Sequence, residues 1–508
     1  MKPDPPRGWE ALYACPLLWL IAMAAAHVAI RVAISPALKW DEAQQIIWSQ
    51  QLQWGYGTQP PLYTWLQWIV NQALGPSVLA LSLLKQALIA LSCAFMWLAT
   101  RELAGRRAAW WAAASLLMLP PFGWYSIRDQ THTVLVMAMT CATWWLLLRI
   151  VRREGRDCVR EFVALGLACG GGMLAKYNFA LMLAALVVAL LSVRATRRAL
   201  FGRGWWLAVL ITCAIAAPHG VWLLSHWHMA SEGTLRLMAI APQRHWGEGL
   251  FNLLSAALGT LALWALFALI AFGSGWWRRP SPAPEPLPWL RPVFGRYLAL
   301  IALALLAMVL VADVTGFRGR WVLPMLAPVP LMAFALRPEL DAHPRGNRFA
   351  GLALALVAVI LIAAGTRPWI AYVDGNPDEL NHPTAQLAQA LQRAGYDGKG
   401  RIISADHMLA GMLRTRFPAA YAADCRTRDG DVPGCVAANV QQAERAGQGW
   451  LLITRADRVE PTWWGQALSQ IPESDSLSRH NLRLPFLMVR QSGALASYDF
   501  IWSPAQPP

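Results

Sequence analysis

The sequence predicts a polytopic α-helical membrane protein with a small α/β domain at its C-terminal end. Of the 508 residues, 56% are hydrophobic and only 14% are charged, whereas soluble chains have about 25% charged residues. About eleven apolar stretches approach the roughly 20 residues that cross a hydrocarbon core. After about residue 367 the chain becomes polar and its apolar runs become short.

The apolar stretches define a predicted membrane domain, residues 1–366. The first stretch is too long for the core of a cleavable signal peptide, so we expect it to remain as the first span. We place the spans near residues 11–34, 77–100, 108–125, 131–150, 161–175, 177–194, 205–227, 249–275, 295–312, 320–336 and 349–366.

The distribution of charge predicts which connections face which side. The net charge is +15, but the basic residues cluster between apolar runs, so no nucleic-acid partner is needed to explain them. By the positive-inside rule the Arg-rich connections are cytoplasmic. They are residues 101–107, 149–160, 194–203, 277–296 and 337–348. The predicted outer side then comprises residues 35–76, 121–130, 228–248, 313–319 and the chain after 367.

Residues 367–508 are expected to form an extracytoplasmic α/β domain. The sequence predicts buried strands at 401–405, 450–454 and 485–489. Helical spacing is found at 379–395 and 405–417, and Asp406 can cap the second of these helices.

The loop from Cys425 to Cys435 is polar and rich in turn-forming residues. It is short enough to be closed by a disulfide in an oxidising compartment. Two free thiols are the alternative.

The first outer loop, residues 35–76, holds the main candidates for chemistry. Asp41 and Glu42 follow the first span, where a carboxylate near hydrocarbon is costly unless it has a function. Neighbouring helical residues point about 100° apart, so one carboxylate could be a base while the other holds a cation or a sugar hydroxyl. A solvated helix cap is the alternative. We expect interfacial helices here, with Trp40, Trp48, Trp54 and Tyr56 at the headgroup level.

Several motifs of the chain resemble those of one superfamily. The loop combines Asp-Glu-Ala at 41–43, Gly-Tyr-Gly at 55–57 and Pro-Pro-Leu-Tyr at 60–63. Further similar stretches follow in the same order at 82–119, 125–136, 170–181 and 316–333. With these motifs the chain resembles the polyprenol-phosphate-dependent glycosyltransferases of GT-C architecture, which include protein O-mannosyltransferases and ArnT-like aminoarabinose lipid A transferases. Gln59 stands where many relatives have lysine.

This resemblance implies an inverting sugar transfer from polyprenyl phosphate, undecaprenyl phosphate in a bacterium, at the periplasmic face of the inner membrane. The acceptor would be lipid A or lipopolysaccharide, another glycolipid, or a protein. Asp41 would be the base and Glu42 would orient the acceptor. Asp129 would position the sugar or the base, with an ion pair to Arg128 as the alternative. The lipid phosphate is already a good leaving group, so a base and charge stabilisation suffice.

Cations on the outer side are candidates for holding the donor phosphate, because Arg can bind two oxygens and Lys acts as a point charge. Basic residues there oppose the positive-inside bias, although snorkelling toward headgroups is the alternative. The predicted donor- and substrate-binding residues are Lys176, Arg244, Arg318, Arg320, Tyr56 and Gln59.

Other motifs carry less information. His226 and His228 are weak metal candidates because no carboxylate or cysteine accompanies them at a fixed spacing. No cofactor is assigned, and a divalent metal stays an open alternative. The glycines at 170–172 lack the Gly-Lys-Ser/Thr ending of a nucleotide-phosphate loop, so they predict close helix packing.

Three other functions compete with the transferase. A transporter or lipid flippase would also place charges in a polar cavity, but the halves lack repeat symmetry and the α/β domain is unexpected there. A polysaccharide polymerase or ligase would use a diphosphate-linked donor. An inactive binding scaffold is the last alternative. Membrane lipids are expected partners in each case.

Overall fold

The structure is a computed structural model that describes residues 8–228, 246–273, 287–427, 430–471, 477–490 and 494–505. The chain divides into two compact units, and each is described by itself. Unit 1 comprises Met1–Ala26, Gln53–Tyr63 and Lys85–Ile360. Unit 2 comprises His27–Leu52, Thr64–Leu84 and Leu361–Pro508. Much of the first outer loop therefore groups with the C-terminal domain, whereas the sequence suggested that it belongs to the membrane domain.

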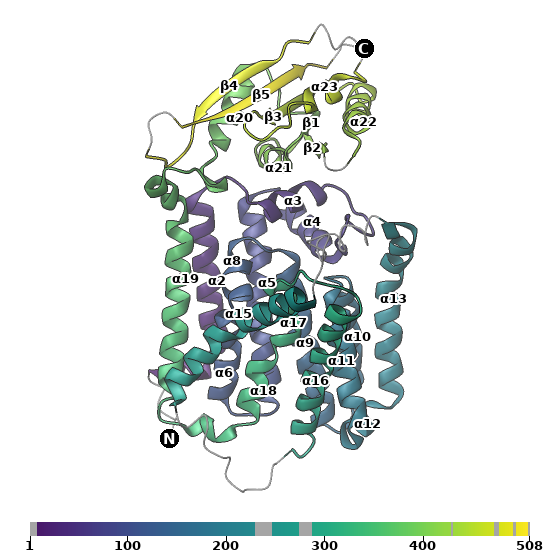
Figure 1. Cartoon of the computed structure of the whole chain (residues 1–508), viewed down its shortest axis with the longest axis vertical. Coiled ribbons are helices and arrows are strands. Elements are labelled where there is room, and N and C mark those ends of the chain that lie inside the picture. Colours follow the sequence, from purple (N-terminus) through teal and green to yellow (C-terminus); the bar gives the residue numbers. More distant parts are fainter. Residues whose placement is uncertain are drawn as a thin grey trace. The chain divides into compact units, whose positions relative to one another are not determined.

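Seven helices of the described chain are long and apolar enough to cross a membrane, and a bent pair would make an eighth span. The seven are α2 (Pro16–Ile34), α5 (Val78–Arg101), α9 (His132–Arg152), α13 (Arg203–Ser225), α15 (Trp246–Phe272), α16 (Leu290–Leu310) and α19 (Gly346–Asp374) (Figure 1). The pair is α11 (Asn178–Ser192) and α12 (Arg194–Leu200), which are bent by 111°. Helix α19 continues past the predicted domain boundary at residue 366.

The remaining predicted spans are helical but short or interrupted. The stretch near 161–175 is α10 (Val159–Met173). The stretch near 108–125 contains α6 (Arg106–Ser115), η1 (Leu116–Met118) and α7 (Pro120–Gly123), and α8 (Tyr125–Arg128) follows. The stretch near 320–336 contains α17 (Gly319–Leu326) and α18 (Val329–Ala335). Prolines lie at the start of α7 and of α18. A proline interrupts a helix because it has no amide hydrogen to donate. Every predicted stretch is thus helical, and the total of about eleven crossings stays a prediction.

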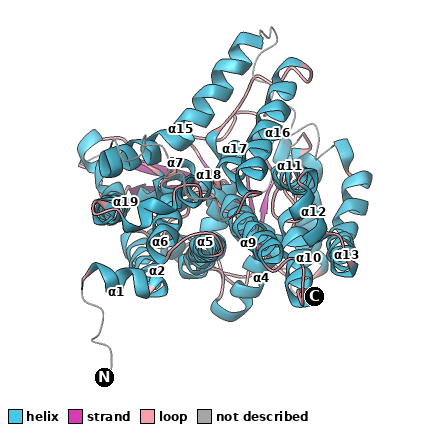
Figure 2. Cartoon of the chain, turned by 90° about the horizontal axis from the view of Figure 1, so that it is seen from below, coloured by secondary structure: helices cyan, strands magenta, loops and turns pink. Residues whose placement is uncertain are grey.

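Helix α10 packs closely against its neighbours through the glycines at 170–172. A β-carbon on Gly170 would lie 2.8 Å from Cβ of Ile215 in α13, and one on Gly171 would lie 2.9 Å from Sδ of Met139 in α9. One on Gly172 would overlap the ring of Phe179 in α11. Figure 2 shows α10 between α9 and α13. The predicted close packing at this run is confirmed, and we refer to it as the glycine seam.

Unit 2 contains two helices from the first outer loop and the C-terminal domain. The loop helices are α3 (Trp40–Trp48) and α4 (Leu62–Leu74), so the prediction that this loop is helical is confirmed. The strands of the domain are β1 (Arg401–Ser404), β2 (Tyr421–Asp424), β3 (Trp450–Arg455), β4 (His480–Pro485) and β5 (Leu495–Ser503). They form one sheet in the order β2-β1-β3-β5-β4, in which β1 is parallel to β2 and β3, and β5 is antiparallel to β3 and β4.

Helices cover both faces of this sheet. One face packs against α20 (Thr384–Arg393) and α21 (His407–Arg416), and the other against α22 (Val432–Arg445) and α23 (Trp463–Leu468). Side chains alternate between the faces, so Ile402 joins the first cluster and Ile403 the second. The predicted α/β domain is therefore confirmed, with both predicted helices and the Asp406 cap, whose carboxylate accepts the amide of Met408 at 3.0 Å.

Two of the predicted strands are confirmed and one is wrong. The runs 401–405 and 450–454 correspond to β1 and β3. Both strands are buried on both faces, so their sequences are continuously apolar. The run 485–489 forms the turn after β4. There the amide of Leu487 donates to the carbonyl of Asn381 at 2.8 Å rather than to a neighbouring strand, and Met488 is 39% exposed with φ of +53°.

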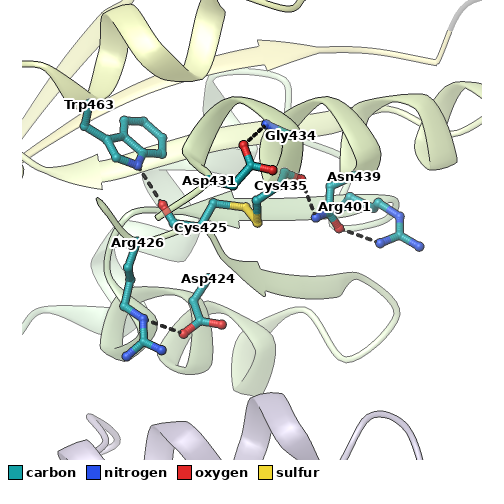
Figure 3. Close-up of a disulfide and its surroundings, with 9 residues drawn as sticks. All are labelled: Arg401, Asp424, Cys425, Arg426, Asp431, Gly434, Cys435, Asn439 and Trp463. Carbon is teal, nitrogen blue, oxygen red and sulfur yellow. Dashed lines mark hydrogen bonds and ion pairs between the residues drawn. A yellow bond between two sulfur atoms is a disulfide. The ribbon is translucent and has the colours of Figure 1, made fainter. Parts of the chain in front are cut away.

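Cys425 and Cys435 form a disulfide, so the disulfide alternative is confirmed and the free thiols are excluded. The bond joins the end of β2 to the first turn of α22 (Figure 3). The indole of Trp463 donates to the carbonyl of Cys425 at 2.7 Å, and the amide group of Asn439 donates to the carbonyl of Cys435 at 2.9 Å. Both ends of the bridge are thus fixed by neighbouring side chains.

The C-terminal domain contains a buried histidine beside two arginines. His382 is 6% exposed, with Arg455 2.6 Å from Nε2 and Tyr498 3.2 Å from Nδ1. Burial, followed by the charges of Arg455 and Arg458, lowers the pKa of His382 to about 3. The ordinary value is about 6.5, so between these values the unfolded chain binds a proton that the folded chain does not.

We therefore expect the stability of the C-terminal domain to be complete above about pH 6.5 and to fall as the pH drops toward 3, by up to about 1.4 kcal/mol per pH unit. Thermal unfolding of the purified full chain at pH 7 and pH 4.5 measures this loss. His382→Gln should reduce the acid sensitivity, whereas substitution of the exposed His480 by Gln should preserve it. An unaltered pH dependence in His382→Gln would contradict the assignment.

Candidate active site

Helix α3 carries the two carboxylates of the first outer loop in its first turn. The backbone of Lys39 is extended at the N-cap, and its amide donates to Oε2 of Glu42 at 3.1 Å. This is the reciprocal half of a capping box, in which an acidic side chain at the third helical position satisfies an amide before the helix. Both carboxylates also interact favourably with the positive end of the helix dipole.

Glu42 is held within unit 2 by a buried arginine. Glu42 is 1% exposed and Arg31 at the end of α2 is 5% exposed, and their closest atoms are 2.6 Å apart. Arg31 also donates to the carbonyls of Ser35 at 2.8 Å and Ala37 at 2.7 Å. Glu42 was expected to orient the acceptor. In the structure its carboxylate pairs with Arg31 at the corner between α2 and α3, and the role of Glu42 toward the acceptor stays a prediction. Asp41, which is only partly buried, is the more accessible of the two acids.

Asp129 lies in unit 1, directly after α8. It is partly buried, and its amide donates to the carbonyl of Tyr125 at 2.9 Å. The guanidinium of Arg128 lies 5.7 Å from the ring centroid of Tyr125. Asp129 therefore keeps the partial exposure that a sugar- or base-positioning residue needs, and its role stays a proposal.

Unit 1 contains a cavity of about 290 Å³ with one polar part and a larger apolar part. The polar part consists of Thr58, Gln59, Lys176, Tyr177 and Asn178. The apolar walls come from α11, α16, α17 and the loop before α17, through Leu181, Leu305, Met308, Val314, Phe317, Trp321, Val322 and Met325. Such a lining suits an amphiphile that has an anionic head and a hydrocarbon chain. We call this the donor cavity.

The lysine and two further polar groups give the donor cavity its chemistry. Nζ of Lys176 donates to Thr133 at 3.1 Å. The hydroxyl of Tyr177 and Oδ1 of Asn178 are buried and make no hydrogen bond within the described chain. Buried polar atoms without partners are costly. A bound ligand can satisfy both, because Tyr177 can donate to a phosphate oxygen and Asn178 can accept from a hydroxyl.

Arg318 and Arg320 flank the donor cavity without lining it. Arg318 directly follows the lining residue Phe317, and Arg320 directly precedes the lining residue Trp321. The guanidinium of Arg318 lies 5.8 Å from the ring centroid of Trp321. Partial burial, followed by the charge of Arg320, lowers the pKa of Arg318. A bound anion would relieve the repulsion between these two cations.

The turn of the first outer loop supplies one wall of the donor cavity. Tyr56 and Gln59 pair through two backbone hydrogen bonds of 3.0 Å. The side chain of Gln59 lines the cavity, but Tyr56 is 3% exposed and its hydroxyl accepts from the amide of Gln53 at 2.9 Å. Tyr56 was expected at the headgroup level and in the substrate set. In the structure it is buried within the turn, and its part in substrate binding stays a prediction.

The remaining predicted residues lie elsewhere. Arg244 lies outside the described residues. His226 is exposed and stacks on Trp222 at 4.6 Å, and His228 is exposed at the end of its described segment. Among the residues that the structure describes, no three His, Cys, Asp or Glu side chains group as metal ligands do.

Three buried or cavity-lining polar residues were not among the site residues predicted from the sequence. Tyr177 and Asn178 are neighbours of the predicted Lys176, and their position at the start of α11 was the available signal. Lys85 is 2% exposed within the candidate span α5. A lysine in an apolar span is itself a functional signal, and here it was treated only as part of a larger matching stretch.

The chain is similar to known membrane glycosyltransferases. Residues 58–222 match the family model described as dolichyl-phosphate-mannose-protein mannosyltransferase. The chain is 30% identical to the lipopolysaccharide core galacturonosyltransferase RgtA of Rhizobium johnstonii over 94% of this chain and 95% of the relative. It is 30% identical to the lipopolysaccharide core galacturonosyltransferase RgtB of the same organism over 79% of this chain and 81% of that one.

A solved structure supports the same architecture. ArnT from Cupriavidus metallidurans, bound to undecaprenyl phosphate, has a TM-score of 0.60 and 15% identity over 97% of this chain and 99% of that one. The fold and these matches define a multi-pass membrane glycosyltransferase of GT-C architecture. Within that superfamily the chain belongs to the same family as the two galacturonosyltransferases.

Proposed function

We propose that the protein transfers a sugar from a polyprenyl phosphate to a hydroxyl of lipid A or the lipopolysaccharide core. In a bacterium the donor lipid would be undecaprenyl phosphate, and the reaction would proceed with inversion at the periplasmic face of the inner membrane. The donor cavity carries the proposal, because it combines Lys176 and two unsatisfied polar groups with apolar walls. The relatives named above make galacturonic acid the first sugar to test.

Each polar group of the donor cavity has a role in this proposal. The ammonium of Lys176 binds the phosphate and stabilises the charge that grows on it as the sugar leaves. The hydroxyl of Tyr177 donates to a phosphate oxygen. Asn178 accepts from a sugar hydroxyl. The chain of the lipid lies along the apolar walls.

The proposed reaction is a single displacement. Asp41 accepts the proton of the acceptor hydroxyl while the oxygen of that hydroxyl bonds to the anomeric carbon. The bond between that carbon and the phosphate oxygen breaks, and polyprenyl phosphate leaves with the electron pair. Attack opposite the leaving group inverts the anomeric centre.

Two observations support an extracytoplasmic location for the C-terminal domain. The Cys425–Cys435 bond needs an oxidising compartment to persist. The Arg-rich connections are placed on the cytoplasmic side by the positive-inside rule, which leaves residues after 367 on the other side. The proposed transfer is accordingly assigned to that side of the membrane.

Mass spectrometry of polyprenyl phosphates and envelope glycolipids tests the function. Cells with the gene intact, deleted, or carrying Asp41→Asn would be compared, with Glu444→Gln in the exposed part of α22 as the matched control. The deletion and Asp41→Asn should both accumulate one glycosyl-phosphoryl-polyprenol and lose one modified glycolipid. If neither pool changes while the protein is expressed, the proposed function is wrong.

Lys176→Met is expected to weaken donor binding. A hydrogen bond to a charged group contributes about 1.5–3 kcal/mol, so KM for the lipid-linked donor should rise about ten- to hundredfold. The comparison is steady-state kinetics of purified protein in detergent with varied donor. Lys399→Met, which changes an exposed lysine in the C-terminal domain, is the control. An unchanged donor KM in Lys176→Met would remove the lysine from the donor site.

A further inference from the structure

The helix that carries Asp41 packs against the C-terminal domain. Within unit 2, α3 and α21 form an extensive contact. Ala43 and Ile46 of α3 and Met408 and Met412 of α21 share one buried hydrophobic cluster. Because the carboxylate of Asp41 is attached to this helix, the contact with α21 fixes where the carboxylate can lie.

A glycine makes this close approach possible. A β-carbon on Gly411 of α21 would lie 2.9 Å from each of Cα, Cβ and the carbonyl oxygen of Ala43. Two of these atoms belong to the backbone of α3, so a flexible side chain cannot relieve the overlap. Any residue larger than glycine at 411 must therefore move one helix away from the other.

Two further contacts fix the two ends of α3. The ring of Trp40, at its start, meets the ring of His407 edge-on with centroids 3.7 Å apart. Just after its end, the side-chain amide of Gln50 pairs with the backbone of Ala422 through two hydrogen bonds of 2.8 Å. Ala422 lies in β2, an edge strand of the sheet. The Gln50 amide thus occupies ladder positions that an additional strand would use.

We propose that the C-terminal domain is a positioning part of the active site, acting through the contact of α21 with α3. Gly411, His407 and Gln50 are positioning residues that set the location of Asp41 and touch neither substrate. The inference rests on the proposed function, because it assumes that Asp41 is the base. By this proposal the α/β domain contributes to the catalytic step by positioning Asp41. This contribution is separate from any contact that the domain makes with an acceptor.

Gly411→Ala tests the proposal with a small structural change. A displacement of about 1 Å can cost a hundredfold in rate, so kcat should fall about ten- to hundredfold. KM for the lipid donor should stay unchanged, because the donor cavity lies in unit 1. The control is Gly465→Ala in α23, where an added β-carbon would meet no atom within 4 Å.

A second variant separates positioning from general damage. Ala43→Gly removes Cβ of Ala43, one of the atoms that the new methyl group would meet. The double variant Gly411→Ala with Ala43→Gly should therefore recover part of the lost kcat. A merely destabilising effect predicts a further loss instead, because glycine within a helix costs about 1 kcal/mol.

Hydrogen exchange provides a measurement that does not need turnover. Amides of residues 40–48 should exchange faster in Gly411→Ala than in wild type or Gly465→Ala. If the wild type shows no glycosyl transfer, the proposed function fails, and faster exchange still supports the α3–α21 contact as a positioning device. The inference is overturned if both kcat and exchange in 40–48 match the Gly465→Ala control.

Discussion

Asp41→Asn is expected to reduce kcat about a hundred- to ten-thousandfold, the range that a positioned general base contributes. The amide keeps the size of the carboxylate and can still accept a hydrogen bond, but it cannot take a proton. The melting temperature and the donor KM should therefore stay close to those of the wild type. Kinetics of purified protein with a lipid-linked sugar and a lipopolysaccharide acceptor measure both quantities.

The control for this variant is Glu444→Gln, which neutralises an exposed acid far along the chain. A preparation of Asp41→Asn that turns over as the wild type does would show that another group takes the proton. Asp129 would then be the next acid to test, since it is the other partly buried carboxylate among the predicted catalytic residues.

Glu42→Gln should lower the free energy of unfolding by about 3–5 kcal/mol, because it leaves Arg31 buried without its counter-charge. Replacing both residues, as in Arg31→Met with Glu42→Leu, should cost less than Glu42→Gln alone. Some loss should remain, because Arg31 also binds the carbonyls of Ser35 and Ala37. Thermal or denaturant unfolding in detergent compares the variants.

An exposed ion pair supplies the control for this effect. Arg156 and Glu154 are 3.0 Å apart but 81% and 71% exposed, so Glu154→Gln should change stability by no more than about 1 kcal/mol. A similar small change in Glu42→Gln would mean that the Arg31–Glu42 pair does not hold the corner between α2 and α3.

The sequence predicts those helices and strands that have apolar surroundings on all sides. Apolar composition alone located every candidate membrane span, and it located β1 and β3, which are covered on both faces. It missed β2, β4 and β5, because edge and half-exposed strands mix polar and apolar residues. It overpredicted 485–489, where Phe486 packs on the domain core from within a turn.

The candidate site was predictable where its chemistry is local. Lys176 and Gln59 were named from short motifs, and both line the donor cavity. The partner of Glu42 was not found, because Arg31 lies in the preceding span and looks like an ordinary basic residue near its end. The contact of Gly411 with Ala43 joins segments that are far apart in the chain, and periodicity contains no information about such pairs.

The glycine seam of α10 has a consequence for how the protein is made. Lipid tails are as apolar as leucine side chains, so the hydrophobic effect does not favour a helix neighbour over a lipid neighbour. The association of α10 with α9, α11 and α13 then depends on van der Waals fit at Gly170, Gly171 and Gly172. A larger residue there would permit insertion and prevent assembly, leaving helices that sit in the bilayer as separate spans and are open to proteolytic quality control.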